Sequence, residues 1–314
     1  MRRWRRRAGQ TGRYGAAGEP AAWRAVYKDY YWDRLEQAFA GAKELGAGSR
    51  GHGLVGYRTI EGETMTRVNG EINDVNEWLK IEVIPGEMVE PLERLTERVI
   101  EGCDAVATRM GFEHGPETLL TVMAAEANVP WMPGRQGYCV DKYPYDKICI
   151  PHSSLRDHDD LQHVVHHEYA HVVNLNLSQG RCPLWLDEAV AMAIGGGADR
   201  RAWSALAKGS AQWLDPEVLD ASFGRNREDE REWRIVWLGY QQSAVIGTYL
   251  AQEHGTRGLG RLMRGFANNS FLRDLLLSAK GLGQVDEALN EVYGFNTRTL
   301  FERSFEWLRA GSGS

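Results

Sequence analysis

Two kinds of hydrophobic pattern follow one another along the chain. In the first, short apolar runs, or apolar residues that alternate with polar ones, predict β-strands. In the second, apolar residues recur every three or four positions, which predicts helices with one buried face. The strand-like segments are residues 79–84, 119–123 and the hairpin 137–151, and the helix-like segments are residues 88–110, 161–174, 183–192 and most of the chain after residue 203. We therefore expect strands and helices first and helices alone in the C-terminal half.

The first 77 residues lack this regular pattern. Residues 1–20 join an arginine-rich start to a glycine-rich polar stretch, so we expect a disordered tail there. A signal peptide would need an apolar core at that place, and none is present. Residues 21–45 are rich in Trp and Tyr and predict a helix that ends in a glycine-rich linker. We interpret residues 1–77 as an N-terminal extension and residues 78–310 as the main domain.

The composition is that of an ordinary globular protein. The 314 residues are 43% hydrophobic and can bury a sizeable core. A formal net charge of -6 does not favour a nucleic-acid-binding protein, and no apolar run reaches the roughly 18 residues of a transmembrane helix. The 4 cysteines fit neither a zinc ribbon nor a dense disulfide framework, so free thiols and a cytoplasmic location are the expectation. Nothing in the sequence indicates the oligomeric state.

Candidate chemistry lies on the helix predicted for residues 161–174, which contains the pattern His-Glu-x-x-His at residues 167–171. His167 and His171 stand four positions apart, so both imidazoles project from one helix face and can reach a single zinc ion. Glu168 lies about 100° round the helix, which leaves it free to accept a proton from water beside the metal. The spacing therefore predicts two metal ligands and a base.

Two further histidines, His163 and His166, lie on the same predicted helix. Either could face the metal if the helix were turned about its axis. Neither completes a pattern with a glutamate in the position of the base, so we interpret both as partly exposed helix residues.

A hydrolytic zinc site needs a third protein ligand and an open position for water. Glu188 can supply that ligand. It lies on the helix predicted for residues 183–192, which follows the first helix after a short connection. An antiparallel return of this second helix would bring Glu188 beside His167 and His171.

These motifs resemble those of the gluzincin metallopeptidases, and most of all the peptidase MA-like domains related to the catalytic domain of zinc aminopeptidases. The run Trp-Leu-Asp-Glu-Ala at residues 185–189 has Ala189 where the family commonly has glycine. The run Tyr-Gln-Gln-Ser at residues 240–243 extends the resemblance, which covers roughly residues 78–310. It implies an α+β, zincin-like fold with a small mixed sheet, an active-site helix that carries His-Glu-x-x-His, and an all-helical C-terminal half.

The resemblance also implies one Zn²⁺ per chain and a role for each residue that matches a family motif. The implied zinc ligands are His167, His171 and Glu188. Glu168 would be the general base and acid. A tyrosine would stabilise the transition state, and Tyr240 is the candidate because it opens the helix that follows the two zinc helices in the family's usual order. Tyr249 and Tyr169 are alternatives, and the packing of an aromatic ring at a helix start would explain Tyr240 equally well.

One feature of some other gluzincins is missing at its usual place. There, an aspartate four residues after the ligand glutamate supports the site, whereas Met192 stands at that position here. Such a carboxylate must come from elsewhere in this chain or be absent.

The predicted function is hydrolysis of peptide bonds in a peptide or protein substrate by a zinc-activated water. A strand of the hairpin at residues 137–151 is a candidate to bind the substrate backbone by strand addition, as an edge strand does in gluzincins. Three alternatives stay open: a zinc amidase or other hydrolase with a non-peptide substrate, a noncatalytic binding domain that keeps the fold, and a structural zinc site.

Overall fold

The structure is a computed structural model of the whole chain. It describes residues 54–58, 64–68, 71–83, 91–114, 118–123, 138–140, 146–151, 155, 157–196, 199–223, 230–267 and 283–311. The tail expected at residues 1–20 and the helix expected at residues 21–45 lie outside these ranges. The boundary predicted at residue 77 therefore stays a prediction.

The chain forms two compact units. Among the described residues, the first, which we call the helical unit, consists of those within 101–114 and 162–311. The second, which we call the sheet unit, consists of those within 54–100 and 115–161. The motif at residues 167–171 and Glu188 both belong to the helical unit.

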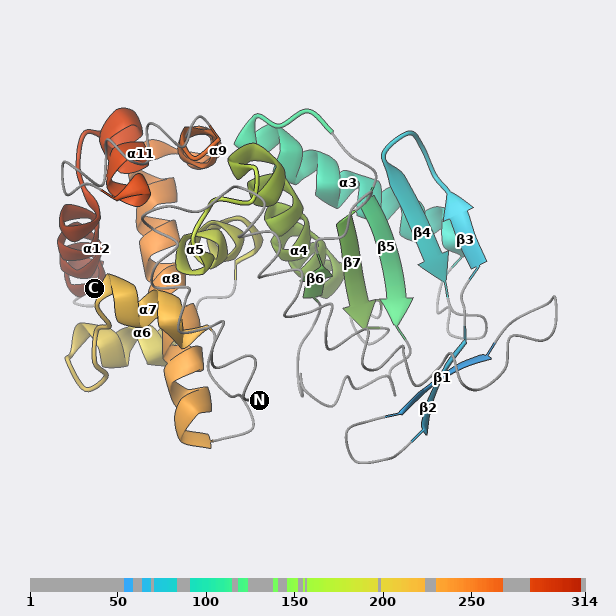
Figure 1. Ribbon diagram of the computed structural model, residues 1–314, viewed down its shortest axis with the longest axis horizontal. Coiled ribbons are helices and arrows are strands. Elements are labelled where there is room, and N and C mark those ends of the chain that lie inside the picture. Colours follow the sequence, from blue (N-terminus) through green and yellow to red (C-terminus); the bar gives the residue numbers. More distant parts are fainter. Residues whose placement is uncertain are drawn as a thin grey trace. The chain divides into compact units, whose positions relative to one another are not determined.

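The strands of the sheet unit form two sheets (Figure 1). β1 (Leu54–Arg58) and β2 (Thr64–Val68) make an antiparallel pair. The larger sheet has the order β3-β4-β5-β7-β6, with its three inner strands parallel and both outer strands antiparallel to their neighbours. Its strands are β3 (Glu71–Asp74), β4 (Leu79–Val83), β5 (Thr118–Met123), β6 (Tyr138–Val140) and β7 (Asp146–Pro151). β6, which forms the predicted hairpin with β7, is an edge strand of this sheet. The binding of a substrate backbone along it stays a prediction.

The described residues contain nine helices. They are α3 (Leu92–Met110), α4 (His158–Ser178), α5 (Leu184–Gly195), α6 (Arg200–Ala207), α7 (Pro216–Ser222), α8 (Glu230–His254), α9 (Thr256–Gly265), α11 (Gln284–Tyr293) and α12 (Thr297–Gly311). α4 is longer than the predicted helix 161–174 by three residues at its start and four at its end. α5 begins one residue after, and ends three residues after, the predicted helix 183–192. No helix in the described part of the chain is long and apolar enough to cross a membrane.

The predicted fold class is wrong for the part of the chain that carries the motif. We expected an α+β zincin-like domain with a small mixed sheet around the active-site helix. The helical unit has no strand among its described residues, and helices make up most of the described chain. β7 ends shortly before α4 begins, but closeness in sequence does not place a strand and a helix in one unit. Alternation of apolar residues reports which residues are buried, and it carries no information on which unit buries them.

α8 runs through the core of the helical unit and fixes the place of α5. Val245, Ile246 and Leu250 of α8 are fully buried. At Gly247 the two helices approach so closely that a Cβ would lie 1.8 Å from the carbonyl oxygen of Ala189. Because only glycine permits this distance, α8 holds the turn of α5 next to Glu188.

Candidate metal centre

α4 and α5 run antiparallel, as the sequence predicted. Asp187, near the start of α5, lies beside His171 in the second half of α4. Gly195, at the end of α5, lies beside His163 and His167 in the first half of α4. The chain reverses between the helices at Gln179 and Gly180, whose φ values of 53° and 69° are left-handed. The tight turn keeps the two helices in contact along their length.

Gly195 makes the closest contact between the motif helices. A Cβ at this position would lie 2.7 Å from Cβ of His167 and 2.8 Å from its Cα and backbone nitrogen. Distances under about 3 Å are well inside normal van der Waals contact, so a side chain would push the helices apart. The absence of a side chain at residue 195 therefore lets α5 lie against the backbone of a candidate ligand.

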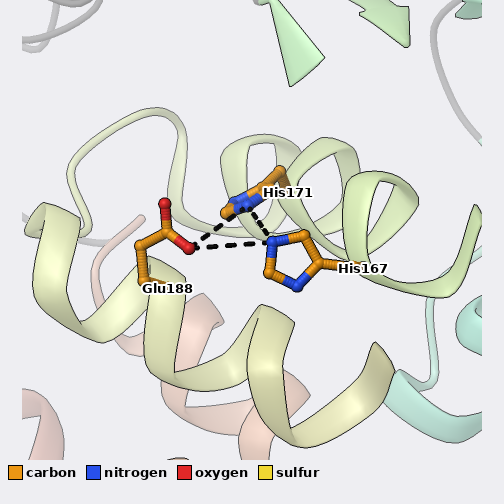
Figure 2. Close-up of side chains that lie close together, drawn as sticks. All are labelled: His167, His171 and Glu188. Carbon is orange, nitrogen blue, oxygen red and sulfur yellow. Dashed lines mark hydrogen bonds and ion pairs between the residues drawn. The ribbon is translucent and has the colours of Figure 1, made fainter. Parts of the chain in front are cut away.

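The side chains of His167, His171 and Glu188 converge between the two helices (Figure 2). The Nε2 atoms of the two histidines are 3.3 Å apart. Oε2 of Glu188 lies 3.7 Å from each of them. All three side chains are largely buried, with exposed fractions of 17%, 10% and 11% in the order of their numbers. The structure thus brings together the three residues that the sequence predicted to meet, and their role as metal ligands stays a prediction.

The cluster fits a zinc ion in size and chemistry. Zn²⁺ binds imidazole nitrogen and carboxylate oxygen at about 2.0–2.2 Å, so tetrahedral ligands lie about 3.4 Å from one another. The observed separations of 3.3 Å and 3.7 Å are close to this value. Two nitrogens and one oxygen also leave a fourth position open. In the part of the chain that the structure describes, no other group of three His, Cys, Asp or Glu residues meets in this way.

His171 is held from its far side by Asp187. Its Nδ1 lies 2.9 Å from Oδ2 of Asp187. Because a carboxylate only accepts hydrogen bonds, Nδ1 carries a proton, and Nε2 is the atom that faces the cluster and could donate its lone pair to a metal. This carboxylate–histidine pair is the usual support of a histidine metal ligand.

Sequence reasoning missed Asp187. Met192 stands at the position where a supporting aspartate was expected, so the sequence did not indicate which residue supplies that carboxylate. The structure supplies the carboxylate from the residue directly before Glu188. The signal was present in the Trp-Leu-Asp-Glu-Ala run, but it was not recognised because neighbouring residues of a helix point about 100° apart.

The local charge favours a cation. Burial lowers the pKa of His171. The negative charges of Asp187, Glu188 and Glu168 raise it by more than this, so that the pKa is about 10. The same carboxylates would stabilise a metal ion in place of that proton. Glu168 is itself buried, with an exposed fraction of 6%, and its effect on His171 places it near the cluster.

The three candidate tyrosines have different surroundings. Tyr240 is half-buried in α8, with its ring 5.1 Å from that of Phe223. Tyr249 is buried and its ring lies 6.3 Å from that of Trp307. The hydroxyl group of Tyr169 is 2.7 Å from Nδ1 of His114, so it is used in a contact with the segment that follows α3. Tyr240 as the stabilising residue stays a prediction.

His163 and His166 do not join the cluster. Nδ1 of His163 donates a hydrogen bond to the carbonyl oxygen of Gly195 at the end of α5. Arg109 donates to the neighbouring carbonyl of Ile194 at 3.2 Å. Burial and the positive charge of Arg109 lower the pKa of His166 to about 4, so this ring is neutral near pH 7. His163 and Arg109 thus hold the end of α5, a role that the spacing of residues in the sequence did not reveal.

Comparisons with known proteins give little beyond a distant likeness. No family profile matches the chain, and no curated protein matches it. One similar structure is the M1 zinc metallopeptidase from Deinococcus radiodurans, with a TM-score of 0.34 and 12% identity over 78% of this chain and 51% of that chain. A point mutant of that enzyme has a TM-score of 0.33 and 12% identity, over 78% of this chain and 52% of that chain. The chain thus spans about half the length of these structures.

Proposed function

We propose that the protein is a zinc-dependent hydrolase that cleaves peptide bonds. The observation that supports this most directly is the convergence of three metal-ligand atoms at tetrahedral spacing, with one ligand histidine held by Asp187. A structural zinc site would fill the fourth position with another Cys or His. Among the described residues none joins the group. An open position is what a hydrolytic site requires.

Each residue of the site has a distinct task in this proposal. His167, His171 and Glu188 would hold the metal. When bound there, zinc lowers the pKa of its water toward neutrality and polarises a substrate carbonyl. Asp187 keeps the proton of His171 on Nδ1, so that Nε2 remains a donor to the metal.

Glu168 would move the proton. It follows His167 on the same helix and is buried beside the cluster. From this place its carboxylate would accept a proton from the attacking water and return it to the nitrogen that leaves. A tyrosine hydroxyl group, for which we propose Tyr240, would donate a hydrogen bond to the oxygen that gains negative charge.

The choice of peptides as substrates rests on the motif. A glutamate that passes a proton from water to a leaving nitrogen suits amide bonds in general. Within that class, the two motifs together resemble those of peptidases. A zinc amidase with a non-peptide substrate would use the same residues and is separated from a peptidase only by its substrates.

The test combines metal content with peptide cleavage. Zinc is measured by mass spectrometry on the wild type, Glu188→Ala and Glu168→Gln, and each protein is incubated with a library of fluorogenic peptides. We expect one zinc per chain in the wild type, its loss in Glu188→Ala, and zinc without cleavage in Glu168→Gln. Glu306→Gln, which changes an exposed glutamate of α12, is the matched control and should retain both zinc and cleavage.

Two outcomes would contradict the proposal. A wild type without zinc would exclude the metal centre. Zinc binding with no cleavage of any library peptide would exclude the peptidase and leave hydrolysis of another substrate, which an amide library of non-peptide compounds would then address.

A further inference from the structure

We propose that Asn174 is a positioning residue that sets the geometry of two of the three candidate ligands, His171 and Glu188, through one side-chain amide. The inference rests on the proposed zinc site. Asn174 matches no motif on which the resemblance depends, and it does not touch the metal position.

Asn174 lies on α4, nearly one turn after His171, and is completely buried, with an exposed fraction of 0%. Its Nδ2 lies 2.7 Å from Oδ1 of Asp187 and 3.2 Å from the backbone oxygen of the same residue. Both oxygens only accept hydrogen bonds. The NH₂ group must therefore face Asp187, and its two hydrogens satisfy both acceptors.

The first bond determines which way the Asp187 carboxylate is turned. The terminal torsion of an aspartate has broad minima, so the group is free to rotate unless its oxygens are held. Asn174 occupies Oδ1, which leaves Oδ2 for Nδ1 of His171 at 2.9 Å. The imidazole ring is then fixed in the plane that directs Nε2 toward the other ligands.

The second bond holds the backbone next to the third ligand. The carbonyl oxygen of Asp187 belongs to the residue before Glu188, in the first turn of α5. A bond from α4 to this oxygen fixes the rotation of that turn. One amide group thus connects the helix that carries both histidines to the helix that carries the glutamate.

Burial makes the arrangement sensitive to change. Asp187 is only 18% exposed, so water cannot easily replace a lost donor. Removing a partner that supports a metal ligand typically weakens metal binding by about 10–100-fold. We expect Asn174 to fall within this range because it acts on two ligands.

The first test compares Asn174→Leu with Asn176→Leu. Asn176 is on the same helix, but its Nδ2 donates to Val172 of that helix at 2.8 Å. Zinc affinity is measured by competition with a chelator, and the visible absorption spectrum of the Co²⁺-substituted protein reports ligand geometry. We expect about tenfold or greater loss of affinity and an altered Co²⁺ spectrum for Asn174→Leu. For Asn176→Leu we expect affinity within about twofold of wild type.

A second pair of variants decides the matter if Asn174→Leu does not fold. Asn174→Asp sets two carboxylates against each other and should weaken zinc binding more strongly than the leucine variant. Adding Asp187→Asn reverses the direction of the side-chain bond and still leaves an acceptor for His171, although the bond to the backbone oxygen of residue 187 stays lost. We expect this exchanged pair to recover part of the lost affinity. A merely structural role of Asn174 would lower the stability of these variants and leave the Co²⁺ spectrum of the folded protein unchanged.

The results separate this inference from the proposed function. If the wild type binds no zinc, the proposed function fails. If the wild type binds zinc and Asn174→Leu binds it equally well, or the exchanged pair is no better than Asn174→Asp alone, only the role of Asn174 is overturned.

Discussion

A single glycine at the end of α5 controls how closely the two motif helices approach. In Gly195→Ala, the new methyl group would meet the Cβ and backbone of His167 at 2.7–2.8 Å. We expect the variant to lose about 1–3 kcal/mol of unfolding free energy and part of its zinc, because His167 must move. Urea denaturation and metal analysis measure the two effects.

Gly311→Ala, at the end of α12, is the matched control, since nothing lies within 4 Å of a Cβ at that position. It should unfold like the wild type and bind zinc fully. Equal stability and equal zinc content in both variants would show that the helices can separate without consequence for the site.

The tyrosine that stabilises the transition state can be identified by comparing two hydroxyl groups on the same helix. Tyr240→Phe should retain zinc and lower kcat by about 100-fold, the effect of removing one hydrogen bond to a developing oxyanion. Tyr249→Phe, whose ring lies against Trp307, should leave kcat nearly unchanged. Steady-state kinetics on a cleaved peptide decides between them. The reverse result would assign the role to Tyr249.

The candidate ligands could be predicted at this scale, and their supports could not. His167 and His171 follow from spacing because helical geometry converts sequence intervals directly into directions, and Glu188 follows from the short connection that returns the second helix antiparallel to the first. Asp187 and Asn174 act through contacts between two helices, which depend on the rotation of each about its axis. No interval in the sequence reports that rotation.

At the scale of elements, α5 is held at both ends by side chains of other helices. His163 of α4 and Arg109 of α3 donate to its last carbonyl groups. At its start, the backbone N–H groups of Trp185 and Leu184 donate to Asp220 of α7. Burial raises the pKa of Asp220 to about 6, although both hydrogen bonds act to lower it. α5 is thus capped by an acid that the fold prefers in its neutral form.

This gives a stability that depends on pH in a defined direction. The pKa of Asp220 in the folded protein, about 6, exceeds its ordinary value of 3.8, so the folded state binds this proton more tightly. The contribution of this proton to the unfolding free energy is complete below pH 3.8 and is lost as the pH rises through about 6. We expect Asp220→Asn, which keeps an acceptor without a charge, to gain stability over the wild type at pH 7.5 and not at pH 4.

Asp220→Ala is the comparison variant, because it removes the cap itself. It should lose about 1 kcal/mol relative to Asp220→Asn at both pH values. Urea denaturation at pH 4 and pH 7.5 measures all three proteins. A wild type and Asp220→Asn that respond equally to pH would contradict the role of burial at this position.

Individual elements could be predicted from the sequence better than their grouping. The segments 79–84, 119–123, 161–174 and 183–192 coincide with β4, β5, α4 and α5. Their assignment to one α+β domain was wrong, because the helical unit assembles residues 101–114 with the described residues of 162–311. That grouping is set by contacts such as those of Gly260 with the carbonyl oxygen of Met110, far apart in sequence.

At the scale of the whole molecule, zinc should act as a stabilising ligand. A ligand that binds only the folded state at a thousandfold excess over its Kd adds about 4 kcal/mol to the unfolding free energy. For a protein of this size that corresponds to a rise in Tm of roughly 10 °C. We expect calorimetry to show this rise for the wild type and for Glu306→Gln, and none for Glu188→Ala. An unchanged Tm in the wild type would exclude a zinc site that joins α4 and α5.

The turn at Gln179 and Gly180 has a consequence for the order in which the protein folds. It places all three candidate ligands within one helix–turn–helix segment, residues 167–188, so that bringing them together closes only a short loop. Short loops close quickly and lose little chain entropy, whereas the packing of α8 on α5 and of α9 on the end of α3 joins distant parts of the chain. We therefore expect zinc to bind during folding and to raise the refolding rate measured by stopped flow, so that the metal centre is a nucleus for the helices that later surround it.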